Sequence, residues 1–412
     1  MLKNYFKIAI AVLKRKKFFT FISLFGISFT LAVLMIITAF VDHVVGASYP
    51  EPNADRSLYI LTTSYTSTKN HNQMNTSPSY DYLNKYVRSL KTPEKVSISS
   101  FSRPVSSFLN NKKYSFKLVN TDAEFWEIAS FNFLEGKPYN DQQIKNGENV
   151  IVINEEARKA YFGSQPAVGK IFTTDGINYR VIGVVKSVAI TKLFTSADVY
   201  APYTCPKSGY DAKGFQGSYK AIVLARKKSD FPAIDAEYQQ TVKKIPFADD
   251  RFDILSSHLD TFLECVIRPG LGNNSDSGIG KLYLIMGILI FIFLLLPTVN
   301  LVNINISRIL ERSSEIGVRK SFGASRSTLV IQFIVENLIL TLIGGCIGLA
   351  LTFLAIWYIN ASGWIPAVDL KINFTVLKYG LLLCIFFGIL SGVYPAFKMS
   401  KLQIIKSLKS AS

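Results

Sequence analysis

The sequence is poor in the residues that build metal, redox and nucleotide sites. Its 412 residues include four cysteines and three histidines, and none of these has the close spacing of a zinc or dithiol motif. Neither Gly136-Lys137 nor Gly169-Lys170 has the preceding glycine and the following Ser or Thr of a phosphate-binding loop. We also find no nucleophile motif and no paired-carboxylate signature. The sequence therefore predicts a protein that is not an enzyme, with no cofactor, no metal and no ATPase motif of its own.

Acidic residues are few, with 29 Asp and Glu against 46 Lys and Arg, which gives a net charge of +17. The excess is confined to three short stretches. Residues 1–17, residues 302–327 and the tail after Pro395 together carry +13, whereas the long segment 42–281 carries only +4. This distribution marks membrane orientation and contact with anionic lipid headgroups, and it argues against binding of nucleic acid.

Charged residues are nearly absent from four long stretches, which are therefore apolar runs. Residues 18–41 form the first run, and the others cover about 282–301, 333–358 and 376–394. At 1.5 Å per residue, 24 helical residues cross a hydrocarbon core of about 30 Å. A signal peptide is the alternative for the first run, but the run is longer than a signal core and lacks a convincing cleavage site. We expect four spans, with the first one retained.

The basic stretches place both termini and residues 302–327 in the cytoplasm, and the segment 42–281 outside. Residues 1–17 alternate apolar and basic positions in a way that suits an amphipathic helix on the inner leaflet. The short loop between the third and fourth spans is nearly neutral, which suits an outside position.

The segment 42–281 has the mixed composition of a large α+β domain. Strand-like runs are 57–63, 96–100, 114–119, 150–153, 179–185, 199–203 and 221–225, and helix-like runs are 79–90, 121–129, 154–162 and 234–244. Asn154 is expected to cap one helix and Gly163 to end it. We expect two subdomains, with about 110–220 inserted in 50–258. The Gly-, Ser- and Asn-rich stretch 268–280 predicts a flexible linker.

The cysteines leave one question open in this domain. Cys205 and Cys265 can form a disulfide if the domain is extracytoplasmic, or they can be two buried free thiols. Cys346 and Cys384 lie in apolar runs.

Some polar and small residues fall inside the apolar runs. Glu336 is either a functional carboxylate or, as we favour, a headgroup-level residue paired with a nearby Arg or Lys. The amides at the end of the second run are expected to bond to neighbouring helices, with contact to a substrate as the alternative. Three glycines at helical spacing permit close helix packing. The predicted helix-packing residues are Asn300, Asn303, Gly344, Gly345 and Gly348.

Residues 307–328 form a charged segment between the second and third apolar runs, which we call the cytoplasmic elbow. It has five basic and two acidic residues, with charged pairs at helical spacing such as Glu315 and Arg319. Gly317 and Gly323 interrupt it. The segment is either a structured docking element or a solvated loop that only fixes topology, and we expect the former.

The elbow and its neighbours resemble a known family. The letters EIGVRKSFGAS, followed by QFIVEN and GGCIG, resemble the signature of the MacB/FtsX-like ABC transporter permeases. The run FWEIASFNFLEGKPYND with the following ENVIVINEEARKAYFG resembles the MacB-like periplasmic core domain. The tail YPAFKMSKL resembles the closing motif of the family, although Gln403-Ile404 stands where a proline is common and Met399-Ser400 where small residues are usual.

The resemblance implies a permease subunit in the bacterial inner membrane that pairs as a homodimer or with a similar permease. It implies that a separate cytoplasmic ABC ATPase docks on the elbow, that its motion reaches the extracytoplasmic domain by mechanotransmission, and that an adaptor or outer-membrane channel can join. The elbow residues that match the family motif are Glu315, Gly317, Arg319, Lys320, Gly323 and Ala324.

The function that follows is export or periplasmic handling of a substrate such as a peptide, an antibiotic or a lipoprotein. One alternative is an FtsX-type regulator of cell-wall hydrolases, against which the large outside domain argues. A peptide-sensing permease is another. A membrane-anchored enzyme is a third alternative, and we find no catalytic motif that supports it.

Overall fold

We analysed a computed structural model of the chain. It describes residues 17–383 except 71, 110, 248–250, 312–317, 319–321 and 323–324, together with residues 385, 386 and 389. The chain divides into two compact units. The helical unit lies in the ranges Met1–Asp42, Leu284–Ser362 and Leu370–Ser412, and the mixed α/β unit comprises His43–Tyr283 with Gly363–Asp369. We call the second unit the ectodomain unit.

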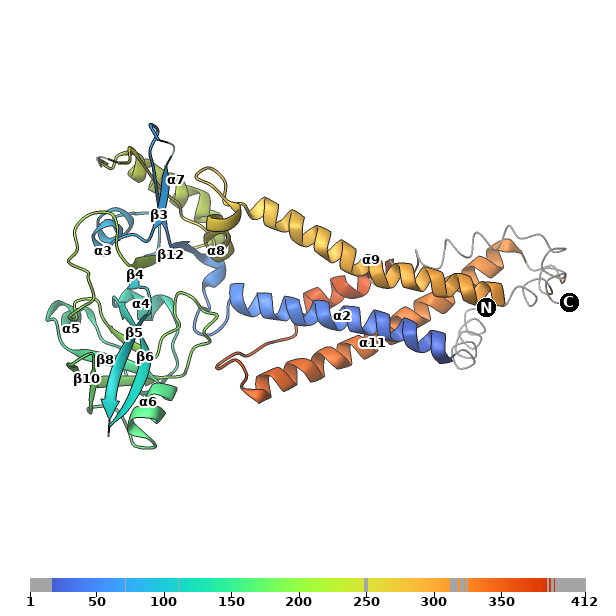
Figure 1. The fold of residues 1–412 in the computed structure, drawn as a ribbon, viewed down its shortest axis with the longest axis horizontal. Coiled ribbons are helices and arrows are strands. Elements are labelled where there is room, and N and C mark those ends of the chain that lie inside the picture. The colour runs from blue at the N-terminus through green and yellow to red at the C-terminus, as the bar shows by residue number, and fades with distance from the viewer. Residues whose placement is uncertain are drawn as a thin grey trace. The chain divides into compact units, whose positions relative to one another are not determined.

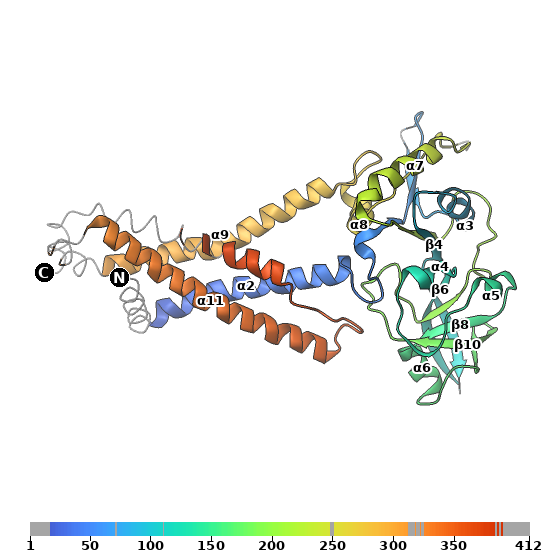
Figure 2. The same cartoon turned by 180° about the vertical axis from the view of Figure 1, so that it is seen from behind.

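Long helices form the framework of the helical unit in the part of the chain that the structure describes (Figure 1). These are α2 (Lys17–Val45), α9 (Ile279–Glu311) and α11 (Arg326–Ser362), and a shorter apolar helix covers Phe374–Leu383. Figure 2 shows the same helices from behind. In the described part of the chain, Thr20–Val45 and Val330–Ser362 are long and apolar enough to cross a membrane, whereas Ile279–Leu295 and Phe374–Leu383 are shorter apolar segments. The expected runs fall on helices, but the count of four spans stays a prediction.

The ectodomain unit contains a ten-stranded mixed sheet and a three-stranded antiparallel sheet, so the expected α+β class is confirmed for this unit. The neighbours in the large sheet are, in order, β1 (Ser57–Ile60), β12 (Tyr219–Leu224), β4 (Lys95–Ser100), β6 (Lys112–Thr121), β11 (Val199–Pro202), β8 (Val150–Asn154), β10 (Ile177–Val185) and β7 (Phe133–Gly136), with β5 (Arg103–Leu109) on β6 and β9 (Ile171–Thr174) on β10. The small sheet has the order β13 (Ile254–Ser257), β2 (Thr63–Thr66), β3 (Gln73–Thr76).

The helices of the ectodomain unit are short. They are α3 (Tyr80–Tyr82), which continues as a π-helical turn over Leu83–Val87, α4 (Glu124–Ile128), α5 (Asp141–Lys145), α6 (Glu155–Phe162), α7 (Phe231–Lys243) and α8 (Phe262–Leu271). The four expected helices all exist. One expected strand was wrong in its extent, because the chain at 57–63 breaks after Ile60 and passes into the other sheet at Thr63.

The caps of α6 are as predicted. The side chain of Asn154 accepts a hydrogen bond from the amide of Ala157 at 2.7 Å, and Gly163 ends the helix with a φ of 65°. That backbone conformation costs glycine no steric penalty. Both signals act within one turn of the chain, and the side-chain amide of Asn154 also donates to the carbonyl of Ala197 and to Asp198.

Separate apolar clusters hold the two ends of the large sheet. One contains β1, β4 and β12 with α7, and includes Ile60, Ile98, Val223 and Tyr238. Two others lie around β6, β8, β10 and β11. The sheet itself continues from one region to the other. The expected division into two subdomains stays a prediction.

Candidate functional site

Six residues of the predicted cytoplasmic elbow match the family motif and lie outside the described residues: Glu315, Gly317, Arg319, Lys320, Gly323 and Ala324. The amphipathic segment up to residue 16 and the basic tail also lie outside them.

The glycines of α11 lie against other helices of the helical unit. A Cβ atom built on Gly344 would lie 2.8 Å from Cγ2 of Ile27 in α2, and one on Gly348 would lie 2.9 Å from the carbonyl oxygen of Ser28. On Gly345 it would lie 3.1 Å from Cδ1 of Leu381. Such spacing leaves no room for a side chain. We call these three residues the glycine seam, in which Gly344 and Gly348 set how closely α2 and α11 approach and Gly345 faces the helix Phe374–Leu383.

The polar residues within the apolar runs differ in exposure and in hydrogen-bond partners. Asn303 is exposed, and its carbonyl accepts a hydrogen bond from the hydroxyl of Ser307. The structure does not describe the side chain of Asn300. Glu336 is buried at 6% exposure and accepts a hydrogen bond from the amide of Gln332 at 3.0 Å. The carboxylate thus has a partner on its own helix, one turn away.

The end of α2 is anchored in the ectodomain unit by an apolar cluster. Val44 and Val45, the last residues of the helix, pack against Tyr59, Phe194 and Phe262. The ring centroids of Tyr59 and Phe194 are 4.4 Å apart, and those of Tyr59 and Phe262 are 5.9 Å apart. Fully burying each such side chain contributes about 1.5–3 kcal/mol. We call this group the helix-end cluster, and it joins α2, β1 and α8 in one packed core.

A buried lysine completes the anchor. Lys192 has no exposed surface, and its Nζ lies 3.1 Å from the carbonyl oxygen of Gly46 and 3.5 Å from that of Val44. The same atom lies 3.5 Å from Oε2 of Glu51, whose Oε1 accepts a hydrogen bond from Thr195 at 2.7 Å. Carbonyl groups at a helix C-terminus favour a positive charge. Lys192 therefore ties the final carbonyls of α2 to a buried carboxylate.

A second buried lysine lies near the same cluster. The Nζ of Lys220 donates to the carbonyl oxygen of Leu193 at 2.6 Å and lies 5.4 and 5.1 Å from the ring centroids of Phe101 and Phe194. Burial lowers the pKa of Lys220 to about 8 from its ordinary 10.5, and the negative charge of Glu51 acts in the opposite direction. The ammonium group is thus kept in an apolar setting by one carbonyl and two aromatic faces.

We predict that Lys220→Met changes how stability depends on pH. Because the pKa is lowered on folding, the unfolded chain binds more protons between pH 8 and 10.5, so this group makes stability rise with pH across that window. The wild type should gain about 1 kcal/mol per pH unit relative to Lys220→Met from pH 8 to 9.5. Thermal unfolding of both proteins and of the exposed-lysine control Lys113→Met measures this. Parallel curves for the wild type and Lys220→Met would contradict it.

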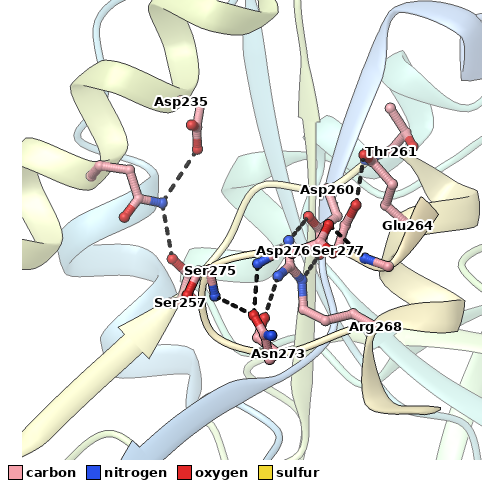
Figure 3. A network of polar contacts seen from close by, with 12 residues as sticks. Asp235, Ser257, Asp260, Thr261, Glu264, Arg268, Asn273, Ser275, Asp276 and Ser277 are labelled. Carbon is pink, nitrogen blue, oxygen red and sulfur yellow. Dashed lines mark hydrogen bonds and ion pairs between the residues drawn. The ribbon is translucent and has the colours of Figure 1, made fainter. Parts of the chain in front are cut away.

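The stretch expected to be a flexible linker is an ordered turn, so that expectation was wrong. Residues 268–271 belong to α8, and the carboxamide oxygen of Asn273 accepts hydrogen bonds from the amides of Ser275 and Asp276 at 2.8 Å each (Figure 3). A Cβ on Gly272 would lie 2.7 Å from the carbonyl of Asp276, and one on Gly278 would lie 2.6 Å from the carbonyl carbon of Leu271. The glycines permit close backbone contact rather than mobility.

A largely buried ion pair joins α8 to Asp260, which precedes the helix, and the same arginine binds the turn. The guanidinium of Arg268 binds both carboxylate oxygens of Asp260, at 2.5 and 2.6 Å, and also donates to the carbonyl of Asn273 at 2.8 Å (Figure 3). The backbone of Asp260 in turn pairs with Tyr59 of β1. Bidentate pairs of this kind are geometrically specific. The chain that leads from the sheet through α8 to α9 is therefore braced at both ends.

The two cysteines of the ectodomain unit are free and buried. Cys205 packs in one core cluster and Cys265 in the helix-end cluster, so they do not form the disulfide that the sequence left open. Burial raises the pKa of the Cys205 thiol to about 12 and also raises that of Cys265. Both thiols therefore stay protonated and unreactive at neutral pH. No group of three or more His, Cys, Asp or Glu in the described ranges could hold a metal ion.

Comparison with known proteins identifies the class. The chain matches the MacB-like periplasmic core domain over residues 20–241 and the FtsX-like permease C-terminal over residues 287–404. The first match covers more than half of the chain. The protein belongs to the MacB/FtsX-like family of ABC transporter permeases, which are membrane proteins, and the resemblance predicted from its motifs is confirmed.

Two relatives are similar to most of the chain. The chain is 26% identical over 324 residues to the uncharacterized ABC transporter permease YknZ of Bacillus subtilis, with 76% of each chain covered. It is 24% identical over 336 residues to the macrolide export ATP-binding/permease protein MacB of Escherichia coli O157:H7, covering 80% of this chain and 50% of MacB. The chain thus spans about half the length of MacB.

Solved structures give weaker matches. The extracellular domain of YknZ has a TM-score of 0.34 at 14% identity, covering 44% of this chain and 91% of that one. A domain of a permease protein from Porphyromonas gingivalis has a TM-score of 0.42 at 15% identity, covering 52% and 93%.

Proposed function

We propose that this chain is a four-span membrane subunit that couples a separate cytoplasmic ABC ATPase to motion of its ectodomain unit. The coupling serves export or periplasmic handling of a substrate such as a peptide, an antibiotic or a lipoprotein. The observation that carries the proposal is the anchoring of α2. Its C-terminal residues enter the helix-end cluster, and its final carbonyls bind the buried Lys192.

A joint of this kind suits mechanical transmission. Protein interiors are packed as densely as organic crystals and have low compressibility, so a packed cluster passes displacement on rather than absorbing it. Helix α2 is an uninterrupted helix of 29 residues. The braced turn after α8, with the Asp260–Arg268 pair, makes the chain that enters α9 similarly resistant to deformation. A tilt of either helix would then reach β1 through side chains in direct contact.

The remaining parts of the proposal rest on the sequence. The elbow, through Glu315, Arg319 and Lys320, is the docking surface for the ATPase, and the basic segments keep it and both termini in the cytoplasm. The subunit pairs as a homodimer or with a similar permease in the bacterial inner membrane. The glycine seam and the amides of Asn300 and Asn303 pack the helices, and an adaptor or outer-membrane channel completes the route.

We predict that Arg319→Glu uncouples the ATPase while leaving the chain in the membrane. The charge reversal removes a cation that can pair with acids in a partner cleft, and such pairs fix register and association rate. Affinity capture of the tagged full-length chain from native membranes should yield an ATPase with the wild type, and much less of it with Arg319→Glu.

The matched control is Arg226→Glu, the same charge reversal at an exposed arginine of the ectodomain unit. It should leave ATPase capture unchanged. If Arg319→Glu and the bulky Gly323→Val both retain ATPase and ATP turnover at the wild-type level, the elbow is not the coupling surface.

A further inference from the structure

The ectodomain unit contains a polar cleft of about 300 Å³ beside the three-stranded sheet. One face of this sheet forms its floor, and α8 with the braced turn forms its wall. Ser256 of β13 lies opposite Ser64 of β2, which lies opposite Asn75 of β3. Because side chains alternate across a strand, these three residues form one row on the face of the sheet, with neighbouring strands about 4.8 Å apart. Two hydroxyls and a carboxamide thus stand side by side on the sheet, and the side-chain amide of Gln73 donates to Ser64 at 2.9 Å and to Asn75 at 3.3 Å.

The opposite face of the same sheet packs against the hydrophobic core. Tyr65 is 1% exposed and packs against the rings of Phe247 and Phe252. Ser257 accepts a hydrogen bond from the buried Tyr238 hydroxyl at 2.6 Å. A one-residue shift of register would bury the polar row, so the sheet is fixed with that row toward the cleft.

The charges that line the cleft cancel. Arg268 is held by both oxygens of Asp260, so neither the guanidinium nor the carboxylate is left to recognise an ion. Burial and the nearby positive charge of Arg268 lower the pKa of His258, which is therefore neutral at pH 7. A phosphate, a carboxylate or an amine would lose its hydration without gaining an opposite charge. The pairing of these charges favours an uncharged ligand.

Hydrogen-bonding capacity remains in the cleft. Nε2 of His258 is buried and has no hydrogen-bond partner among the described residues. His258 follows directly after the end of β13 at Ser257 and lines the cleft. At one end the carboxamide of Asn274 is already paired, since it accepts a hydrogen bond from Gln73 at 3.3 Å and donates one to Thr66 at 3.1 Å. Buried polar groups are normally paired, so the unpaired ring nitrogen of His258 beside a row of hydroxyl and amide groups favours a ligand that forms a hydrogen bond with it.

We propose that this cleft binds an uncharged ring compound rich in hydroxyl and amide groups, the chemistry of an N-acetylhexosamine. Side-chain hydroxyls and carboxamides each donate and accept, which matches sugar hydroxyls and the N-acetyl amide. The apolar surface of Leu61 and Pro269 completes the lining and suits the C–H face of a sugar ring. An extended peptide would instead add to a strand edge, whereas these groups lie on the face of the sheet.

The test is a calorimetric titration of the full-length chain with N-acetylglucosamine and with its β-1,4-linked dimer. The protein is purified in a zwitterionic detergent, because glucoside and maltoside detergents carry competing sugars. N-Acetylglucosamine 6-phosphate and the neutral peptide N-acetyl-dialanine amide are the comparison ligands. We expect the neutral sugar to bind. The dimer will bind more tightly if the ligand is a glycan chain, and equally if it is a free sugar.

The variants Ser256→Val and Asn75→Leu should each weaken sugar binding about tenfold, since each removes a hydrogen-bonding group at the cleft. Ser115→Val removes an exposed strand hydroxyl from β6, outside the cleft, and should leave binding unchanged. Unaltered melting temperatures will show that the variants fold. No binding by the wild type, tighter binding of the phosphate or the peptide, or equal binding by all variants would overturn the proposal. No ATPase is present, so the outcome is independent of the proposed transport function.

Discussion

Replacing Lys192 with methionine is expected to lower the melting temperature of the ectodomain unit by roughly 6–20 °C. The substitution leaves the carboxylate of Glu51, which is 6% exposed, without its buried cation. Breaking a buried ion pair by removing one partner costs about 3–5 kcal/mol. For a domain of this size each kcal/mol lowers the melting temperature by roughly 2–4 °C. The carbonyls of Val44 in the last turn of α2 and of Gly46 just after it lose their donor as well.

The matched control is Lys213→Met. Lys213 also pairs with a carboxylate, Asp81, but its side chain is 84% exposed, and such surface pairs contribute about 0–1 kcal/mol. Thermal unfolding of the full-length proteins in detergent, followed by tryptophan fluorescence, compares the two variants. The expected contrast comes from burial, since both changes remove a lysine from an ion pair.

The double variant Lys192→Met with Glu51→Gln separates the lost pair from lost packing. Neutralising both partners of a buried pair is often nearly neutral for stability, so the double variant should recover most of the loss. If Lys192→Met is as mild as Lys213→Met, or if Glu51→Gln brings no recovery, the anchor that we assign to Lys192 is wrong.

The sequence predicts the ectodomain unit best where its signals are local. Asn154 and Gly163 fix the ends of α6 because a side-chain cap and a left-handed residue act within one turn of the chain. Alternating or continuous β-branched residues likewise locate β8 and β10. The order of strands in the ten-stranded sheet has no such signal. It depends on contacts between residues far apart in the chain, such as those of β1 with β12.

The anchor of α2 could not be predicted for the same reason. Lys192 stands among mostly apolar residues such as Leu193 and Phe194, and nothing near it in the sequence indicates that its ammonium group meets Glu51 and a helix end. For the stretch 268–280 a local signal was present in the sequence, but it was misleading. Its composition indicates a linker, yet Gly272 and Gly278 are required for close backbone contact. Composition alone does not distinguish a glycine that gives mobility from one that permits contact.

The candidate residues of the elbow and of the apolar runs fall into two groups, according to whether the structure describes them. The elbow motif lies outside the described residues, so its role stays a prediction from the sequence. The glycines of α11 are described, and helical spacing alone was enough to find Gly344 and Gly348, because residues four apart share a face. The spacing did not indicate which helix they face. That depends on the fold of the helical unit.

Substituting Gly348 with alanine is expected to destabilise the helical unit. The added methyl group would lie 2.9 Å from the carbonyl oxygen of Ser28 and 3.2 Å from Cβ of Leu31. A backbone carbonyl cannot rotate away as a side chain can, so α2 and α11 must separate. Overpacking of this kind costs about 1–3 kcal/mol. Close approach through small residues is also what packs helices in a membrane, where the hydrophobic effect gives no drive for association.

Two further glycines make the test specific. Gly287 of α9 has nothing within 4 Å of an added Cβ, so Gly287→Ala should be neutral or slightly stabilising, because alanine favours the helix. Gly344→Ala would meet the side chain of Ile27 at 2.8 Å, and the added change Ile27→Ala should relieve that contact. We expect the melting temperature in detergent to fall for Gly348→Ala even with Ile27→Ala present, and to recover for Gly344→Ala. Equal behaviour of Gly348→Ala and Gly287→Ala would mean that the seam does not set the distance between α2 and α11.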